Sequence, residues 1–225
     1  MNNDYIFFPE KKHKYTIILL HGMNTTNNSL ILLTHKIIKK YKNIKIILPN
    51  SPKRTINWYE EPEENVSSWY NYFTCNNNKM EHDTIDIQHF YEQVERINKI
   101  INKEIKLLDN KSENIIIGGI SQGGTLAFHI GLNYHSKLGG IIGIHTVLMN
   151  NVTQISKNTQ DIPIYLFSGE KDEIYNIKLQ RKSLKVLRKL KYKIIWNIQK
   201  KLKHCEYCKK ENSFIIQSIK DIIIN

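Results

Sequence analysis

The chain has 225 residues, of which 40% are hydrophobic and 24% charged, and its formal net charge is +12 at pH 7. This length and composition are typical of one globular domain with a substantial core, and they exclude a disordered or fibrous chain. The amino terminus lacks the features of a secretory signal, residue 2 is not the glycine needed for N-myristoylation, and no apolar run approaches the ~20 residues of a membrane span. We therefore expect a cytoplasmic protein.

The strong positive charge is a property that many nucleic-acid-binding proteins share. Here the 33 Lys and Arg residues are scattered along the chain, and no basic and aromatic platform typical of RNA binding appears. We therefore predict no nucleic-acid partner. The abundance of Lys, Asn and Ile fits AT-rich coding, and the alternative is a weak peripheral attraction to anionic membrane surfaces.

Cysteine usage indicates a reducing compartment, because three cysteines cannot form a disulfide framework. Cys205 and Cys208 have Cys-x-x-Cys spacing, but the second pair that would complete a structural zinc site is missing. The simpler interpretation is that both cysteines lie beside His204 without a metal. We therefore expect no metal and no cofactor.

Strands and helices alternate along the whole sequence. In chain order, the patterns predict a possible edge strand within 1–14, a strand at 15–20, a helix from Ser29 as N-cap to Lys42, a strand at 44–48, a long loop at 49–82, a helix at 83–108, a strand at 114–118, a helix at 124–133, a strand at 139–144, a loop at 145–161, a strand at 162–167, a helix at 176–190, a strand at 192–198 and a helix at 209–224. This alternation predicts a doubly wound, mostly parallel α/β sheet with helices on both faces, in one domain spanning 1–225.

The first regular strand, 15–20, runs directly into His21-Gly22-Met23. Gly22 would let the backbone approach a ligand closely, and Met23 would then present its backbone N–H. The loop at 49–82 is unusually long, and long loops are often functional. Its aromatic pairs, Trp58 with Tyr59 and Trp69 with Tyr70, would line an apolar groove; the alternative is a packed surface loop anchored by its tryptophans.

The strongest signal is the segment Gly119-Ile120-Ser121-Gln122-Gly123, which follows the β-branched strand at 114–118 and precedes a helix. Strand, sharp turn and helix around Gly-x-Ser-x-Gly are typical of a nucleophile elbow, in which flanking glycines make room for a serine in a strained conformation. Ser121 is therefore the candidate nucleophile. The backbone N–H of Gln122 is placed to stabilise an oxyanion together with that of Met23. The alternative is a glycine-rich turn with an incidental serine.

The segment after the next strand, 145–149, would also reach the active-site edge of the sheet. We expect His145 and Leu148 to contact substrate there, with the segment either covering the groove as a lid or simply packing as a loop.

Chain order identifies the partners of the serine, because in α/β-hydrolases the nucleophile is followed by Asp or Glu and then by His. Only His204 follows the acid cluster of Glu170, Asp172 and Glu173, and Asp161 precedes its strand and lies at the wrong end of it. The cluster and His204 each follow a strand, so they meet at the edge where open α/β sheets bind ligands. Asp172 would hold His204, which would accept the proton of Ser121.

Together these motifs resemble the acyl-protein thioesterase / carboxylesterase family of α/β-hydrolases. The resemblance rests on His21-Gly22, on Gly-Gly-Ile-Ser-Gln-Gly-Gly at 118–124, on Gly169-x-x-Asp172, on the late His204, and on Ser-Trp-Tyr-Asn at 68–71. It implies hydrolysis of thioesters or esters of long acyl chains, including S-palmitoyl cysteines of proteins. By matching position, Ser121, Asp172 and His204 form the triad, and Met23 and Gln122 form the oxyanion hole. The family usually has Ser-Gly where this chain has His145-Thr146.

Two other classes of function stay open at this point. A general carboxylesterase or a lysophospholipase would use the same triad on the same acyl carbonyl, so the sequence does not separate them from a palmitoyl-protein hydrolase. A non-enzymatic binding module on a hydrolase fold is the other alternative, although the order of the three candidate residues disfavours it. The sequence does not indicate the protein targets or the oligomeric state.

Overall fold

The computed structural model describes residues 4–57, 61–74, 84–149 and 155–224. In chain order the elements are β1 (Tyr5–Phe7), β2 (Tyr15–Leu20), the short 3-10 helix η1 (Asn27–Leu30), α1 (Ile31–Lys40), β3 (Ile44–Leu48), β4 (Lys53–Ile56), β5 (Glu63–Ser67), α2 (Ile87–Leu107), η3 (Ser112–Asn114), β6 (Ile115–Ile120), α3 (Ser121–Asn133), β7 (Gly140–Ile144), η4 (Lys157–Thr159), β8 (Ile164–Gly169), α4 (Ile177–Ser183), α5 (Lys185–Lys189), β9 (Ile194–Gln199) and α6 (Lys209–Ile224).

A seven-stranded sheet in the order β1-β3-β2-β6-β7-β8-β9 forms the centre of the molecule. Within this sheet, β3, β2, β6, β7, β8 and β9 pair in parallel, and only β1 runs antiparallel, along the outer edge of β3. The predicted mostly parallel α/β sheet is therefore confirmed. Because the parallel strands point the same way, the segments that follow β2, β6, β7, β8 and β9 emerge at one edge.

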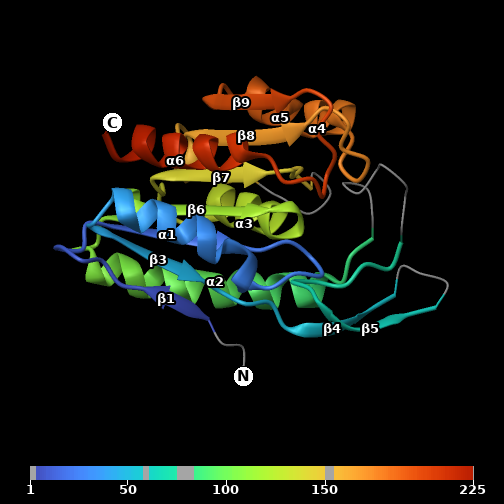
Figure 1. Ribbon diagram of the computed structural model, residues 1–225, viewed down its shortest axis with the longest axis horizontal. Coiled ribbons are helices and arrows are strands. Elements are labelled where there is room, and N and C mark those ends of the chain that lie inside the picture. The colour runs from blue at the N-terminus through green and yellow to red at the C-terminus, as the bar shows by residue number, and fades with distance from the viewer. Residues whose placement is uncertain (1–3, 58–60, 75–83, 150–154, 225) are drawn as a thin grey trace.

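Helices cover both faces of the sheet, with α1 and α6 on the face turned toward the viewer in Figure 1. Successive side chains of a strand point to opposite faces of the sheet, so each strand contributes residues to two separate cores. In β6, Ile116 packs in the core with α1 and α6, whereas Ile115 and Ile117 pack in the core with α2 and α3. All three side chains are fully buried, and each contributes about 1.5–3 kcal/mol of hydrophobic stabilisation.

Several elements differ from the sequence prediction. The segment expected to be a loop, 49–82, contains the antiparallel hairpin β4–β5; its strands are polar and partly exposed, so they lack the apolar run used to find strands. Ser29 is not the cap of α1 but lies inside η1, where its hydroxyl donates to the carbonyl of Thr26. The single helix expected at 176–190 is divided at Leu184 into α4 and α5. Trp58 and Tyr59 lie outside the described residues.

A helix that crosses a bilayer must be both long and apolar. Among the described residues, no helix meets both requirements for crossing a membrane.

Candidate active site

Ser121 occupies a sharp turn between β6 and α3, with no intervening loop, because β6 ends at Ile120 and α3 begins at Ser121. Its φ of 51° lies in the left-handed region, which is strained for a residue with a side chain. Tight packing beneath the turn explains the flanking glycines. A Cβ on Gly123 would lie 2.3 Å from the carbonyl oxygen of His21, and a Cβ on Gly119 would lie 2.5 Å from the carbonyl carbon of Gly123. The elbow therefore requires glycine at both positions.

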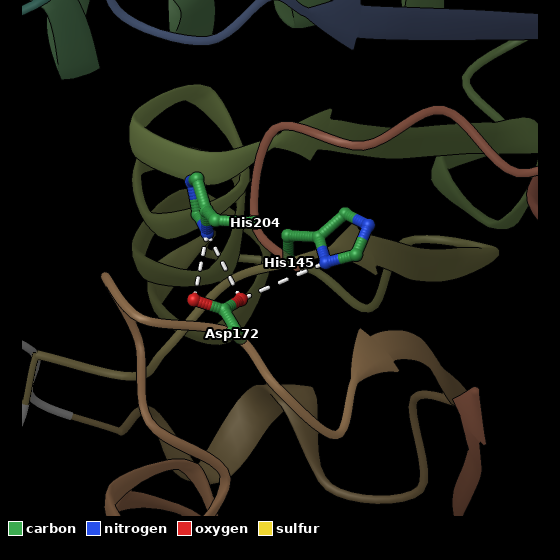
Figure 2. A group of neighbouring side chains, drawn as sticks. All are labelled: His145, Asp172 and His204. Carbon is green, nitrogen blue, oxygen red and sulfur yellow. Dashed lines mark hydrogen bonds and ion pairs between the residues drawn. The ribbon is translucent and has the colours of Figure 1, made fainter. Parts of the chain in front are cut away.

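The structure brings Ser121, His204 and Asp172 into one hydrogen-bonded chain. His204 Nε2 lies 2.8 Å from Ser121 Oγ. On the other side of the ring, His204 Nδ1 lies 2.9 Å and 3.0 Å from the two carboxylate oxygens of Asp172 (Figure 2). With the proton on Nδ1 directed at the carboxylate, Nε2 is left with the lone pair that can accept the serine proton. This arrangement is suited to generating an alkoxide-like nucleophile.

Asp172 is held as a carboxylate although it is almost completely buried. Its Oδ1 accepts hydrogen bonds from the backbone N–H groups of Ile174 at 3.0 Å and Tyr175 at 2.7 Å. Burial raises the pKa of Asp172, but hydrogen bonds from His145 and His204 and the charge of His204 outweigh it and lower the pKa to about 2. Asp172 is therefore fully ionised at neutral pH.

The two acids flanking Asp172 have other partners. Glu173 accepts the backbone N–H of His204 at 3.2 Å, and Glu170 accepts that of Lys201 at 3.4 Å. Neither contact involves the imidazole ring. Among the three acids that the sequence left open, Asp172 is the one whose carboxylate meets the ring of His204.

Met23 and Gln122, whose backbone N–H groups are expected to form an oxyanion hole, both lie near the serine. Gly22 and Met23 line the same pocket as Ser121, and a Cβ on Gly22 would lie 3.5 Å from Cβ of Ser121, so the end of β2 lies against the elbow. Gln122 is in the first turn of α3, where backbone N–H groups have no partner within the helix. The helix dipole at this end favours a developing negative charge.

The side chain of Gln122 has a separate structural role. Its Oε1 accepts the backbone N–H of Trp69 at 2.9 Å, and its Nε2 donates to the carbonyl of Tyr70 at 2.9 Å. The indole N–H of Trp69 donates to the carbonyl of His21 at 2.8 Å. These bonds fasten the segment around Trp69 to both the elbow and the turn after β2.

A pocket of about 530 Å³ opens directly over Ser121 and His204. Its wall is mostly apolar on the side of α1 and mixed on the side of the segment before α6, and it consists of Gly22, Met23, Thr25, Ser29, Leu30, Leu32, Leu33, Lys36, Ile120, Ser121, His145, His204, Cys205, Glu206, Tyr207, Glu211 and Asn212. Leu30 and Leu33 are nearly buried, whereas Leu32 is 76% exposed at the rim. An acyl chain entering the pocket would meet these leucines.

Among the described residues expected to line the groove or contact substrate, which are Trp69, Tyr70, His145 and Leu148, the structure places only His145 on this wall. Trp69, Tyr70 and Leu148 are fully buried in the core that packs α2 and α3 against the sheet, so they are scaffold rather than pocket. Of the two alternatives for 145–149, a lid over the groove or a packed loop, the structure shows the packed loop. Val147, Leu148 and Met149 are at most 2% exposed, because they are apolar enough to be drawn into the same core.

Sequence reasoning missed two residues next to the triad. Thr146 donates from its hydroxyl to the carbonyl of Ser121 at 3.2 Å, and Glu211 on α6 places Oε2 3.5 Å from Nε2 of His145. Thr146 follows a strand at the active-site edge, which is a usable signal. Glu211 has none, because a glutamate in the first turn of a helix is usually read as a favourable interaction with the helix dipole.

The described residues also contain a grouping with metal-ligand chemistry. Ligand atoms of His145, Asp172 and His204 all lie within 4.8 Å of one another. Both ring nitrogens of His204 already take part in the chain from Ser121 to Asp172, and a metal on Nδ1 would displace its proton. The geometry therefore fits proton transfer better than metal binding.

Known proteins resemble this chain in sequence and in fold. Acyl-protein thioesterase 1 of Schizosaccharomyces pombe is 28% identical over 189 residues, covering 82% of this chain and 80% of the relative. The protein of the same name from Cryptococcus neoformans var. neoformans serotype D is 26% identical over 194 residues, covering 83% and 79%. Arabidopsis thaliana SOBER1 superposes with a TM-score of 0.81 at 21% identity, covering 93% and 99% of the two chains. Zea mays acyl-protein thioesterase 2 gives 0.77 at 19% identity, covering 99% and 100%.

The two solved structures are too distant in sequence to show more than the α/β-hydrolase fold. A family model described as Phospholipase/Carboxylesterase, however, matches residues 1–223, which is nearly the whole chain. This match agrees with the elbow and with the hydrogen bonds that join Ser121, His204 and Asp172. We conclude that the protein belongs to the phospholipase/carboxylesterase family of hydrolases.

Proposed function

We propose that this protein is a serine hydrolase that cleaves thioester or ester bonds of acyl chains, and that acylated proteins are its principal substrates. Ser121 is the nucleophile, His204 the general base and acid, and Asp172 the residue that orients the histidine. The observation that carries the proposal is the continuous contact from Ser121 Oγ through His204 to Asp172 at the base of an apolar pocket.

Acylation of the enzyme begins when Ser121 Oγ attacks the carbonyl carbon of the substrate. The serine proton moves to His204 Nε2, and the resulting imidazolium is stabilised by the buried carboxylate of Asp172. The carbonyl oxygen becomes an oxyanion that accepts hydrogen bonds from the backbone N–H groups of Met23 and Gln122. Collapse of this intermediate expels the cysteine thiolate of a thioester or the alkoxide of an ester, which takes the proton from His204.

Deacylation repeats these steps with water as the nucleophile. His204 accepts a proton from water, the hydroxide attacks the acyl-serine carbonyl, and the oxyanion forms in the same place. Ser121 then leaves with the proton from His204, and the free acid is released. No redox step occurs, so the chain needs no cofactor for this chemistry.

The choice of substrate rests on the pocket and on the relatives. Leu30, Leu32 and Leu33 offer an apolar wall for a fatty chain, and the relatives in Cryptococcus neoformans and Schizosaccharomyces pombe are named acyl-protein thioesterases. Such substrates are tethered to membranes, so the net charge of +12 supports a weak contact with anionic lipid during turnover. We place the enzyme in the cytoplasm, where S-acylated protein segments are accessible.

A fluorophosphonate probe tests the chemistry directly. We expect one labelled residue in the wild type, Ser121, and no labelling of Ser121→Ala, whose turnover should fall by roughly 10³-fold or more. Circular dichroism would establish that the variant is folded. An unlabelled but folded wild type would support a binding module instead, and activity retained by Ser121→Ala would remove the elbow from the mechanism.

A substrate panel separates the acyl-protein thioesterase from the two other hydrolases. Turnover of an S-palmitoyl peptide, a lysophospholipid and a short-chain ester would be compared at equal enzyme concentration. We expect the largest kcat/KM for the S-palmitoyl peptide. A preference for the lysophospholipid or for the short ester would assign the enzyme to those activities while leaving the triad intact.

A further inference from the structure

A second histidine approaches the carboxylate of Asp172 from a different side than His204 (Figure 2). His145 Nδ1 lies 3.6 Å from Oδ2 of Asp172, and His145 Nε2 lies 3.5 Å from Oε2 of Glu211. His145 follows β7 and has a strained φ of 46°, and its side chain is only 2% exposed. A buried imidazole is thus placed between two carboxylates, one of which belongs to the proposed triad.

Charge balance favours a cationic imidazole at this position. A neutral His145 would leave Asp172 and Glu211 as two negative groups sharing one poorly solvated site, which is costly. The titratable groups that face the ring among the described residues are Asp172 after β8, Glu211 on α6 and His204 before α6. Burial alone lowers the pKa of His145, but the close approach and the charges of Asp172 and Glu211 raise it to about 9.

One contact opposes this assignment. The backbone N–H of Gly169 points at His145 Nδ1 from 3.3 Å, which suits a neutral ring whose Nδ1 carries a lone pair. This contact is shorter than the carboxylate contacts at 3.6 Å and 3.5 Å, but a neutral backbone N–H stabilises the ring less than two buried carboxylates of opposite charge do. The contact with Gly169 requires an Nδ1 without a proton, whereas the contact with Asp172 requires an Nδ1 that carries one. A measurement of the protonation of Nδ1 therefore decides between them.

We propose that His145, held by Glu211, is a positioning residue of the active site: as an imidazolium it fixes the orientation of the Asp172 carboxylate and offsets part of its negative charge. The proposal rests on the triad of the proposed function. In it, His145 never touches the substrate carbonyl and transfers no proton during turnover. It acts through Asp172 on His204.

The expected consequence is a shift in the pH dependence of turnover. The rings of His145 and His204 have centroids 5.7 Å apart, so a positive His145 disfavours protonation of His204, the inactive form of the base. Removing this charge would make protonation of His204 easier. At this separation and an intermediate dielectric, the acidic limb of kcat/KM should move upward by about one pH unit.

The test compares the wild type with His145→Gln, which retains a polar side chain of similar reach without the charge. We expect kcat/KM at neutral pH to fall on the order of 10-fold, through looser positioning of Asp172, together with the upward shift of the acidic limb. A purely structural role would lower the rate and leave the limb in place. An unshifted limb in a folded His145→Gln protein would overturn the proposal.

Nitrogen NMR of the histidine rings gives a readout that does not depend on activity. In the wild type at pH 7, both nitrogens of His145 should carry protons, and Glu211→Gln should move the titration of this ring to lower pH. Glu206→Gln is the matched control, because Glu206 lines the same pocket but accepts the backbone N–H of Lys203. A neutral His145 ring at pH 7, or a titration unmoved by Glu211→Gln, would refute the arrangement even if His145→Gln failed to fold. If instead no substrate is turned over and Ser121 is not labelled, the proposed function fails while the ring titration still stands.

Discussion

Replacing Asp172 with Asn tests the triad and its electrostatics in one variant. Asn has the same shape, and its amide oxygen would remain the acceptor for the backbone N–H groups of Ile174 and Tyr175, now at 3.0 Å and 2.7 Å. Its amide NH₂ would then face Nδ1 of His204, which would have to become an acceptor and move its proton to Nε2. Because Nε2 could no longer accept from Ser121, turnover should fall on the order of 10⁴-fold.

The same substitution has a calculable effect on stability. The pKa of Asp172 falls from 3.8 to about 2 on folding, because the contacts with His145 and His204 and the charge of His204 outweigh the effect of burial, which raises the pKa. A depressed carboxylate pKa stabilises the fold above pH 3.8, and this stabilisation is lost as the pH falls toward 2. The shift corresponds to about 2 kcal/mol at neutral pH. The Asn variant should therefore be less stable than the wild type by about this amount at pH 7, and the gap should close in strong acid.

Two assays test the expected losses of activity and stability in Asp172→Asn. Ester hydrolysis gives kcat, and urea denaturation at pH 7 and near pH 3 gives the free energy of unfolding. Glu170→Gln and Glu173→Gln are the controls, since both acids flank the same turn and bond only backbone groups outside the ring. The reasoning fails if Glu173→Gln loses as much activity as Asp172→Asn, or if the stability gap is independent of pH.

Three further expectations follow from the pocket and the core. Lengthening the acyl chain of a thioester from four to twelve carbons should raise kcat/KM by up to about fourfold per methylene placed against the leucine wall, at ~0.8 kcal/mol each; a flat series would indicate a short-chain carboxylesterase. Glu104→Gln should lower the free energy of unfolding in urea by about 3 kcal/mol or more, because Lys45 Nζ lies 2.6 Å from Glu104 Oε1 in a buried site and would lose its counter-charge. The double change Lys45→Met with Glu104→Leu should lower it far less, because it leaves no buried charge unpaired. Burial lowers the pKa of His129 from 6.5 to about 4, so between pH 6.5 and pH 4 the unfolded chain binds a proton that the folded chain does not, and the free energy of unfolding should drop as the pH falls. His129→Leu should flatten this pH dependence of stability, and an unchanged dependence would show that other groups set the acid sensitivity.

The sheet and the elbow could be predicted from sequence because both depend on local patterns. The buried strand Ile115–Ile120 is a continuous β-branched and glycine run, and the glycines around Ser121 are required by atoms only a few ångströms away. Chain order then narrowed the acid and base to residues that the parallel strands deliver to one edge. The structure joins Ser121, His204 and Asp172 by hydrogen bonds at that edge, and their catalytic roles stay a prediction.

The surroundings of the site could not be predicted in the same way. An aromatic residue in a long polar segment looks like a groove wall, but Trp69 is fully buried, with its backbone N–H bonded at the elbow and its indole N–H bonded at the turn after β2. Glu211 is brought to His145 by the packing of α6 across the sheet, which no local pattern encodes. Contacts of this kind depend on where a helix crosses the sheet, and therefore on the tertiary structure.

The burial of Trp69 also determines where substrate selectivity must reside. The segment around Trp69 and Tyr70 is fastened to Gln122, so the inner side of the elbow is occupied by the protein itself. The open side is formed by the turn after β2, by α1 and by the segment from His204 into the first turn of α6. Changes in acyl-chain preference should therefore arise from residues such as Leu32 and Tyr207 on that side, which are exposed and free to vary without disturbing the core. The elbow therefore determines the chemistry, and the pocket wall determines which acyl chain reaches Ser121.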